Sequence, residues 1–359
     1  MKKLSLAAVL YLSTAAVAFA DSNSLIITQT SVGGGAPSLN FTQSSSGALA
    51  SVIQNGNNAL TGVQTGAGGT TLNVDQENPT NGAVNTINYT GRGNSNVTID
   101  QRAANGIFTA SGSAGNTANI DIADNTLGGS GKVNSLALDQ VGFNNTATVY
   151  DTFAGAAGVG YDALQIGQYS DSAAAGNKIQ VTSAGRDNLY ALQQGGNIAN
   201  ISILGGGQNT TLTQTNTADN ATSANTANLT ISGAGLNFTQ TGTLNNLTAN
   251  LNGTITNFGL QGFQSGTNNK GTVTQTHAEI DLATNINVLD QTGTNNTATA
   301  TQTNTVNSHF TIAQNGTGDM ATVAQTGTNN VASLTQQGNI NTASLTQSGT
   351  GATAIIAQH

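Results

Sequence analysis

The chain contains no cysteine and no tryptophan, and it has only two prolines in 359 residues. Without cysteine it can form neither a disulfide scaffold nor a thiolate-ligated metal site. Charged residues make up 7% of the chain and aromatic residues 4%, whereas about 25% of an ordinary globular domain is charged. Disordered chains are typically rich in proline and charge, so the scarcity of both also argues against disorder.

Four residue types dominate what is present. Glycine, threonine, asparagine and glutamine together account for nearly half of the chain. Glycine, asparagine and threonine are poor helix formers, and sequences rich in glutamine and asparagine are disposed to β-aggregation. The composition therefore predicts an all-β protein.

Basic residues are scarce as well. The chain has 8 Lys and Arg against 16 Asp and Glu, and Lys270 is the only basic residue from Asp187 onward. Nucleic-acid binding requires clusters of Lys and Arg that neutralise phosphates, so we expect no nucleic-acid partner. The acidic residues are scattered singly along the sequence, as is typical of residues that keep an aggregation-prone chain soluble.

The first twenty residues have the pattern of a secretory signal peptide. Lys2 and Lys3 precede an apolar run, and Ala18-Phe19-Ala20 provides a small-x-small cleavage site. No later stretch approaches the roughly 20 apolar residues that a membrane helix needs. We therefore expect residues 1–20 to be removed and the mature chain to be exported.

A short repeat runs through the C-terminal part of the chain. From Gln264 onward, successive glutamines of the repeat stand eleven or twelve positions apart, with a single longer step. Asn330, Ala332, Leu334 and Gln336 fall on alternate positions, and alternate residues of a strand share one face. Each unit is thus predicted to be a strand with Asn, Ala, a hydrophobic residue and Gln facing inward. Gly and Asn in the following four positions are expected to supply the positive φ of a tight turn.

A single strand and turn bury too little apolar surface to offset the loss of chain entropy. Stacked units share a core, as in other repeat proteins. The predicted fold is therefore an all-β solenoid, competent for cross-β assembly, in which two units of 22–23 residues in total form one flattened rung. The mature chain would form roughly fifteen rungs at about 4.7 Å spacing.

The regularity of the repeat divides the chain. We expect regular repeats over 264–359, similar repeats in looser register over 21–101, and degenerate β repeats with Gly-rich loops over 102–263. In the middle segment Asp151 takes the glutamine place eleven residues after Gln140, and segments 118–122 and 227–231 alternate but lack the glutamine.

Inward amides at the same place in successive rungs can form hydrogen-bonded ladders along the stack. The predicted fibre-core ladder comprises Gln264, Gln275, Gln291, Asn296, Gln302, Gln314, Gln325, Asn330, Gln336, Asn341, Gln347 and Gln358. The predicted turn glycines are Gly266, Gly293, Gly316, Gly327, Gly338 and Gly349. The repeat runs to Gln358, so we expect the last strand to leave an edge of unpaired backbone groups, which is a template for another strand.

These spacings resemble the curlin repeat, S-x5-Q-x-G-x-x-N-x-A-x3-Q. The resemblance is strong over 285–358 and partial over 21–101. Its residues are Ser308, Gln314, Gly316, Asp319, Ala321 and Gln325, with Asp in the Asn place, and Asn330, Gln336, Gly338, Asn341, Ala343 and Gln347, with Asn in the Ser place. The resemblance implies secretion through the periplasm and an outer-membrane pore, and nucleated assembly on the cell surface with itself and related curli subunits. The product would be an amyloid fibre for biofilm matrix and adhesion.

Other functions have weaker support. The histidines do not cluster, as metal ligands must, and we expect neither a metal nor a cofactor. Asp75 and Glu77 flank Gln76 and could serve glycoside hydrolysis, but an enzyme with a small-molecule substrate is not expected. The main alternative is a monomeric β-solenoid, an adhesin or ice-binding protein, that uses outward threonines such as Thr297, Thr299 and Thr301. Fibre formation by the purified chain distinguishes the two.

Overall fold

The computed structural model describes residues 23–30, 38–44, 48–55, 59–65, 70–77, 85–92, 95–102, 116–123, 135–141, 145–151, 162–169, 177–184, 187–195, 197–204, 209–215, 225–233, 235–252, 260–276, 287–305 and 308–359. The predicted signal peptide, residues 1–20, lies outside them. The described residues form strands and connections without a helix, and none of them therefore forms a helix that could cross a membrane.

Consecutive strands alternate between two large sheets. The nine-stranded sheet consists of β1 (Asn23–Thr30), β3 (Ala48–Asn55), β5 (Thr70–Glu77), β7 (Ser95–Arg102), β9 (Ser135–Val141), β11 (Asp162–Tyr169), β13 (Asp187–Gln193), β15 (Asn209–Gln214) and β17 (Gly235–Thr239). The 13-stranded sheet consists of β2 (Leu39–Ser44), β4 (Leu60–Thr65), β6 (Ile87–Arg92), β8 (Ala118–Ala123), β10 (Ala147–Asp151), β12 (Ile179–Ser183), β14 (Ala199–Ile203), β16 (Ala227–Ser232), β19 (Leu247–Asn252), β21 (Thr272–Thr276), β23 (Thr299–Thr305), β25 (Thr322–Thr328) and β27 (Ser344–Thr350).

Two small sheets complete the stack. Four two-residue strands, β18 (Gly242–Thr243), β20 (Gly266–Thr267), β22 (Gly293–Thr294) and β24 (Gly316–Thr317), pair along one edge. Beyond β17, backbone hydrogen bonds continue the nine-stranded side to β26 (Val331–Ser333) and β28 (Thr353–Ile355). We call this sheet with its continuation the nine-stranded side.

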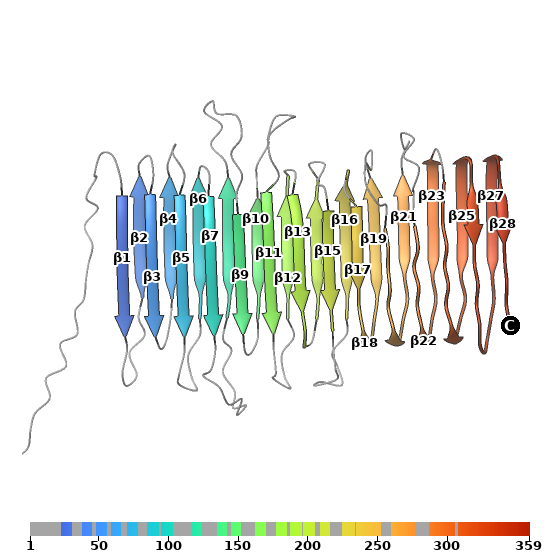
Figure 1. Ribbon diagram of the computed structural model, residues 1–359, viewed down its shortest axis with the longest axis horizontal. Coiled ribbons are helices and arrows are strands. Elements are labelled where there is room, and N and C mark those ends of the chain that lie inside the picture. The colour runs from blue at the N-terminus through green and yellow to red at the C-terminus, as the bar shows by residue number, and fades with distance from the viewer. Residues whose placement is uncertain are drawn as a thin grey trace, which may run out of the picture.

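All strands of both sheets pair in parallel, and each turn of the chain adds one strand to each sheet. Figure 1 shows the resulting stack, in which strands follow one another along the long axis in chain order. Parallel neighbours need a connection that crosses back, and here the strand of the opposite sheet is that connection. The prediction of an all-β solenoid is confirmed.

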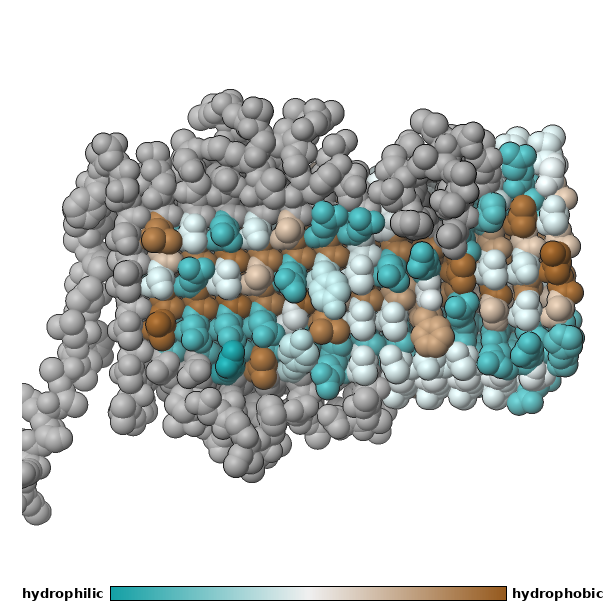
Figure 2. Space-filling model, in the orientation of Figure 1, coloured by the Kyte–Doolittle hydropathy of each residue, from teal (hydrophilic) through white to brown (hydrophobic). Residues whose placement is uncertain are grey.

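The core lies between the two sheets. Burial alternates residue by residue within the strands, for example in β12 and β14. Ile120, Val149, Val181 and Ile201 lie at the same place in successive strands and are each at most 2% exposed. Burial of each such side chain contributes about 1.5–3 kcal/mol. Outward residues instead form polar and apolar rows along the stack, visible on the face in Figure 2.

The spacing between equivalent residues varies much more than the sequence repeat suggests. It is 23 residues near the C-terminus, between Gln302 and Gln325, but 39 residues separate Gln101 from Gln140. Parallel pairing requires only that the strands match, so connections of different length leave the stack intact. Strands β8 to β19 therefore continue the two sheets through the segment described above as degenerate.

The loss of glutamine in that segment concerns one sheet only. On the 13-stranded sheet the glutamine place is filled, between Gln64 and Gln275, by Gly91, Ile122, Asp151, Ser183, Ile203, Ile231 and Leu251. On the nine-stranded side the glutamines continue without interruption, because Gln140, Gln168, Gln193, Gln214 and Gln240 belong to it. Within this segment the glutamines of the repeat are therefore carried by the nine-stranded side.

Candidate assembly site: amide ladders and an open edge

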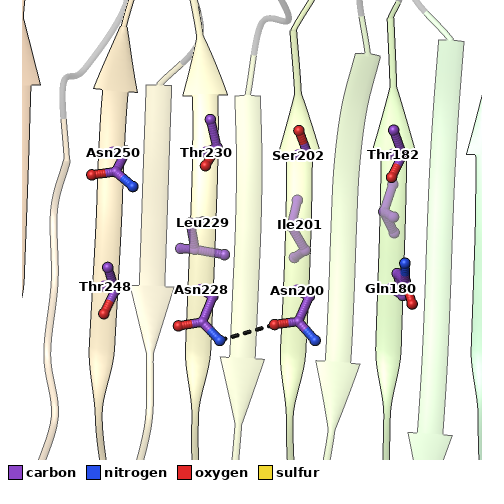
Figure 3. Close-up of a pocket in the computed structure, with 11 residues that line it drawn as sticks. Gln180, Thr182, Asn200, Ile201, Ser202, Asn228, Leu229, Thr230, Thr248 and Asn250 are labelled. Atoms are coloured by element: carbon purple, nitrogen blue, oxygen red, sulfur yellow. Dashed lines mark hydrogen bonds between the residues drawn. The ribbon is translucent and has the colours of Figure 1, made fainter.

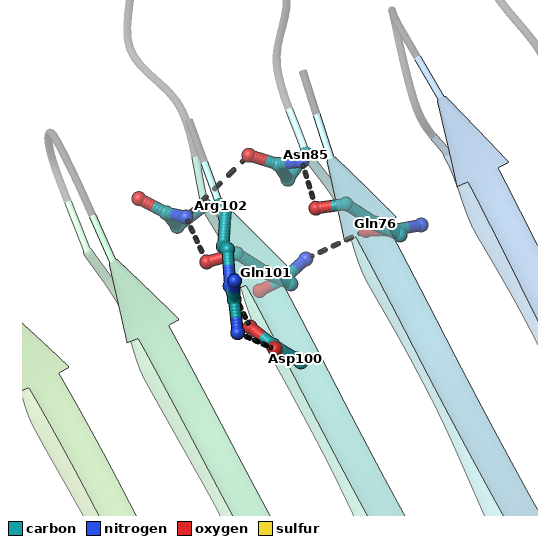
Figure 4. A network of polar contacts seen from close by, with 6 residues as sticks. Gln76, Asn85, Asp100, Gln101 and Arg102 are labelled. Carbon is teal, nitrogen blue, oxygen red and sulfur yellow. Dashed lines mark hydrogen bonds and ion pairs between the residues drawn. The ribbon is translucent and has the colours of Figure 1, made fainter. Parts of the chain in front are cut away.

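Glutamines from successive rungs of the nine-stranded side stand in a single column, which is buried from Gln54 to Gln336. Nε2 of Gln76 donates to Oε1 of Gln54 at 2.7 Å, and Nε2 of Gln101 donates to Oε1 of Gln76 at 2.9 Å, as Figure 4 shows for the second pair. The column continues through Gln140, Gln168, Gln193, Gln214, Gln240, Gln264, Gln291, Gln314, Gln336 and Gln358.

The polarity of this column reverses in the middle. Up to Gln168 each amide donates to the preceding rung, and from Gln193 onward each donates to the following one. Oε1 of Gln168 and Oε1 of Gln193 are consequently buried without a hydrogen-bond partner among the described residues. A buried acceptor without a donor costs about 1–3 kcal/mol, so this junction is the weakest point of the column.

Most glutamines of this column also close the connection that follows them. The second hydrogen of Gln140 Nε2 is donated to the backbone oxygen of Thr146 at 3.0 Å, and Asn145 Nδ2 donates back to the backbone oxygen of Gln140. Gln240 repeats the bond to Asn246 at the same separation along the chain. Glutamine has both the length and the two donors that this double role requires. This closure of the turn accounts for the Gln and Asn of the repeat.

Asparagines form a second column at the entry to the 13-stranded sheet. It runs from Asn85 through Asn116, Asn145, Asn177, Asn197, Asn225, Asn245 and Asn269 to Asn296. The next place is Asp319, which is fully buried. Asn341 follows in the column. Its side-chain amide is oriented so that both its nitrogen and its oxygen have hydrogen-bond partners, and Nδ2 then donates to Asp319 Oδ1 at 2.9 Å. Asn296 Oδ1 and Asp319 Oδ2 have no hydrogen-bond partner among the described residues, so the carboxylate interrupts this column.

The residues predicted as one ladder thus fall into separate columns within a single chain. Gln264, Gln291, Gln314, Gln336 and Gln358 lie on the nine-stranded side. A short column on the 13-stranded sheet contains Gln275, Gln302, Gln325 and Gln347. Asn296 and Asn341 belong to the asparagine column, whereas Asn330 donates to the backbone oxygen of Ser348.

Sequence reasoning missed the ladder glutamines of the middle segment and most of the asparagine column. A local signal exists for part of them, because the asparagine of the column follows five residues after its glutamine in Gln140–Asn145, Gln240–Asn245 and Gln264–Asn269. The gap is nine residues after Gln168, four after Gln193 and eleven after Gln214, so the same spacing does not identify those glutamines.

The predicted turn glycines divide into two groups. Gly338 and Gly349 have φ values of 114° and 126°, as expected. Gly266, Gly293 and Gly316 do not have positive φ, and the positive φ lies one residue later, at Thr267, Thr294 and Thr317. A Cβ at Gly316 would meet no atom within 4 Å. The expectation is therefore corrected at these three glycines, because the strand pairing from β18 to β24 places the left-handed conformation on the threonine. Gly327 lies in β25, in register with Gly349, and its φ of 157° is also positive.

The stack ends in an open edge at β27 and β28. No described strand pairs with the far side of either, and Leu345 and Gln347 are only half-buried where their counterparts Val323 and Gln325 are buried. Ile356 is 46% exposed. The edge thus presents unpaired backbone groups together with the inward side chains of a rung, which are the two elements that a further parallel strand would use.

The model of the curlin associated repeat matches residues 316–349. These residues run from β24 through β25 and β26 into β27. The chain matches no curated protein and no solved structure. The match supports the relation to curlins that the spacing indicated. Within the matched residues, Gln325 and Gln336 each combine a ladder hydrogen bond with a hydrogen bond that closes the following turn.

Proposed function

We propose that this protein is an exported structural protein that assembles with copies of itself into curli-like amyloid fibres, which serve biofilm matrix and surface adhesion. The open edge at β27 and β28 carries the proposal, because its exposed inward side chains and unpaired backbone groups match the inside of the stack. The curlin repeat at 316–349 adds support from sequence. The partners proposed are a second copy, related curli subunits and an outer-membrane secretion pore.

The column structure supports assembly by addition of rungs. Each added rung would extend three amide columns as well as the backbone ladder, and such ladders stabilise cross-β stacks. An enzymatic role is not part of the proposal. Among the described residues, no group of three or more His, Cys, Asp or Glu is arranged to hold a metal ion.

The proposal is tested with the purified mature chain at micromolar concentration. We expect Thioflavin T signal, fibres in electron micrographs, and fibre diffraction at about 4.7–4.8 Å along the axis. Fragments of these fibres should shorten the lag time when added as seeds. A protein that stays monomeric over days, with or without seeds, contradicts the proposal.

A second function is favoured by one observation, the flat polar face of the 13-stranded sheet. Thr272, Thr299 and Thr322 stand in register there, and Thr276, Thr303 and Thr326 form a parallel row. Nearer the middle, a shallow groove of about 290 Å³ crosses rows of Asn, Ser and Thr, and Figure 3 shows Asn228 bonded to Asn200 within it. A monomeric adhesin or ice-binding protein would use this face, and thermal hysteresis in a monomeric sample is its test.

A further inference from the structure

The outer face of the nine-stranded sheet brings together acidic residues that are far apart in the sequence. Asp75, Asp100 and Asp139 are in direct register on β5, β7 and β9. Adjacent parallel strands lie about 4.8 Å apart, so three carboxylates follow one another along the sheet. Figure 2 shows hydrophilic side chains gathered side by side on this face. Long connections separate these three residues in the sequence, so the sequence alone shows them as isolated charges.

The charges of this row are unequally compensated. Arg102 binds Asp100 with two hydrogen bonds, from Nε at 3.1 Å and from an Nη at 2.6 Å, and Figure 4 shows the pair. Asp139 Oδ1 is a buried atom without a hydrogen-bond partner among the described residues. Burial and, to a lesser degree, the charge of Asp100 raise the pKa of Asp139, while Arg102 lowers it. Among the described residues Asp139 forms no ion pair of its own, whereas Asp100 is paired with Arg102.

The row of side chains stops at the next strand, where Gly167 is in register with Asp139. A hollow of about 340 Å³ opens over this glycine, and its walls include Asp100, Asp139, Tyr169, Tyr190 and Leu192. A Cβ on Gly167 would lie 3.1 Å from Asp139 Oδ1 and 3.6 Å from the Tyr169 ring. The carboxylate and the ring thus converge above the position that has no side chain.

The tyrosines give the hollow a particular chemistry. Tyr190 is 44% exposed and Tyr169 is partly buried. Burial raises the pKa of the Tyr169 hydroxyl most, and electrostatic repulsion from Asp139 and then Tyr190 raises it further. The Tyr169 ring therefore lies in the negative potential of Asp139. Aromatic rings beside a carboxylate attract organic cations, through the ring quadrupole and the opposite charge together.

We propose that the hollow over Gly167 binds an aliphatic ammonium group, with Asp139 as its counter-charge and the rings of Tyr169 and Tyr190 as its walls. A divalent metal ion suits the place less well, since such ions require several converging oxygen ligands and the described residues contain no such group. The ammonium group can come from a free diamine or from an amino sugar. This inference does not depend on fibre formation, because every residue involved faces outward on a sheet that a single chain completes.

Equilibrium dialysis of the full-length protein tests the proposal, since it measures binding whether the protein is monomeric or assembled. The probes are 1,5-diaminopentane, a glucosamine trisaccharide, and its fully N-acetylated form as the neutral control. We expect at least one of the two amines to bind at neutral pH and the acetylated sugar not to bind. Which amine binds distinguishes the two sources. Binding of the acetylated sugar as strongly as the amine, or no binding of either amine, overturns the proposal.

Variants connect binding to the hollow. Asp139→Asn should weaken amine binding about tenfold or more, and Tyr190→Ala should weaken it by about fivefold. Gly167→Thr fills the hollow with an outward side chain of the kind that Thr213 carries in the same row, so the fold should be retained. Asp75→Asn, in the same row but outside the hollow, is the matched control. Unchanged binding by Asp139→Asn and Gly167→Thr, both with wild-type circular dichroism, contradicts the assignment.

Discussion

At the scale of single residues, the double role of the ladder glutamines distinguishes inward from outward positions. Gln325 is fully buried and donates to Gln302 Oε1 at 2.6 Å and to the backbone oxygen of Val331 at 2.9 Å. Its neighbour Thr326 is exposed. The two positions are adjacent in sequence and belong to opposite faces of β25.

We expect Gln325→Lys to lower the free energy of unfolding by several kcal/mol, because it buries an unpaired ammonium group and removes the three hydrogen bonds of the Gln325 amide. Thr326→Lys should change the free energy of unfolding by no more than about 0.5 kcal/mol. Denaturant unfolding of the two variants measures the difference. Equal losses would mean that the assignment of faces is wrong.

The turn glycines provide a second matched pair. Gly349 has a φ of 126°, and a Cβ there would lie 1.8 Å from the backbone oxygen of Gly327. Gly316→Ala should therefore be nearly neutral, whereas Gly349→Ala should destabilise the chain by more than about 1 kcal/mol. Thermal unfolding followed by circular dichroism compares them, and a larger loss in Gly316→Ala would refute the distinction.

Replacing the side-chain carboxylate of Asp319 by an amide should stabilise the protein. As asparagine it would donate to Asn296 Oδ1, which has no partner among the described residues, and would complete the column. Asp319→Asn should raise the free energy of unfolding by about 1 kcal/mol, the typical net worth of a hydrogen bond. Asn296→Asp, which places two carboxylates next to each other, is the control and should be destabilising. A lower melting temperature for Asp319→Asn would contradict this account of the column.

At the scale of elements, the last strand separates folding from assembly. In a parallel strand, alternate residues direct their backbone groups to opposite sides. Leu334 and Gln336 donate to the backbone oxygens of Ile355 and Ala357, so Ile356 directs its own N–H to the open side.

Proline removes that N–H. We therefore expect Ile356→Pro to keep the β-sheet circular dichroism of the wild type but to elongate poorly from wild-type seeds. Ile355→Pro instead disturbs the pairing of β28 with β26 and should lower the melting temperature. Elongation of Ile356→Pro at the wild-type rate would argue against growth at this edge, and the other end of the stack would then be examined with Ile27→Pro on β1.

At the scale of the whole molecule, the acidic side chains make the stability of the fold depend on pH. The net charge is −8 at pH 7 and the isoelectric point is about 4.5. Burial, with a smaller contribution from Asp100, raises the pKa of Asp139, and burial raises the pKa of Asp290, both above the ordinary value of 3.8. The carboxyl groups of Asp139 and Asp290 thus bind their protons more tightly in the folded state than in the unfolded state.

The stabilisation by these protons is fully present below the unfolded pKa of about 3.8 and is lost as the pH rises through the raised folded pKa values. We expect the double variant Asp139→Asn, Asp290→Asn to be more stable than the wild type at neutral pH, and the gain to shrink as the pH falls below the folded values. Melting temperatures across this range test the prediction, and a gain that grows in acid would contradict it.

The sequence alone determined the fold class and the two faces of each strand. Alternation with a period of two is a local property, so Asn330, Ala332, Leu334 and Gln336 could be placed inward without knowledge of their neighbours in space. The stacked architecture and the relation to curlins were indicated by the scarcity of charge and proline and by the recurrence of glutamine. These features are also local, because each can be recognised within a few repeats.

Only the tertiary structure decided which residues meet across rungs. Between 21 and 39 residues separate successive glutamines of the main column, since connections of different length are compatible with the same strand register. The separate amide columns, the interruption at Asp319 and the row of Asp75, Asp100 and Asp139 were hidden from the sequence by this variation. Backbone pairing is indifferent to the length of a connection, so the contacts along the stack depend on register in space and not on spacing along the chain.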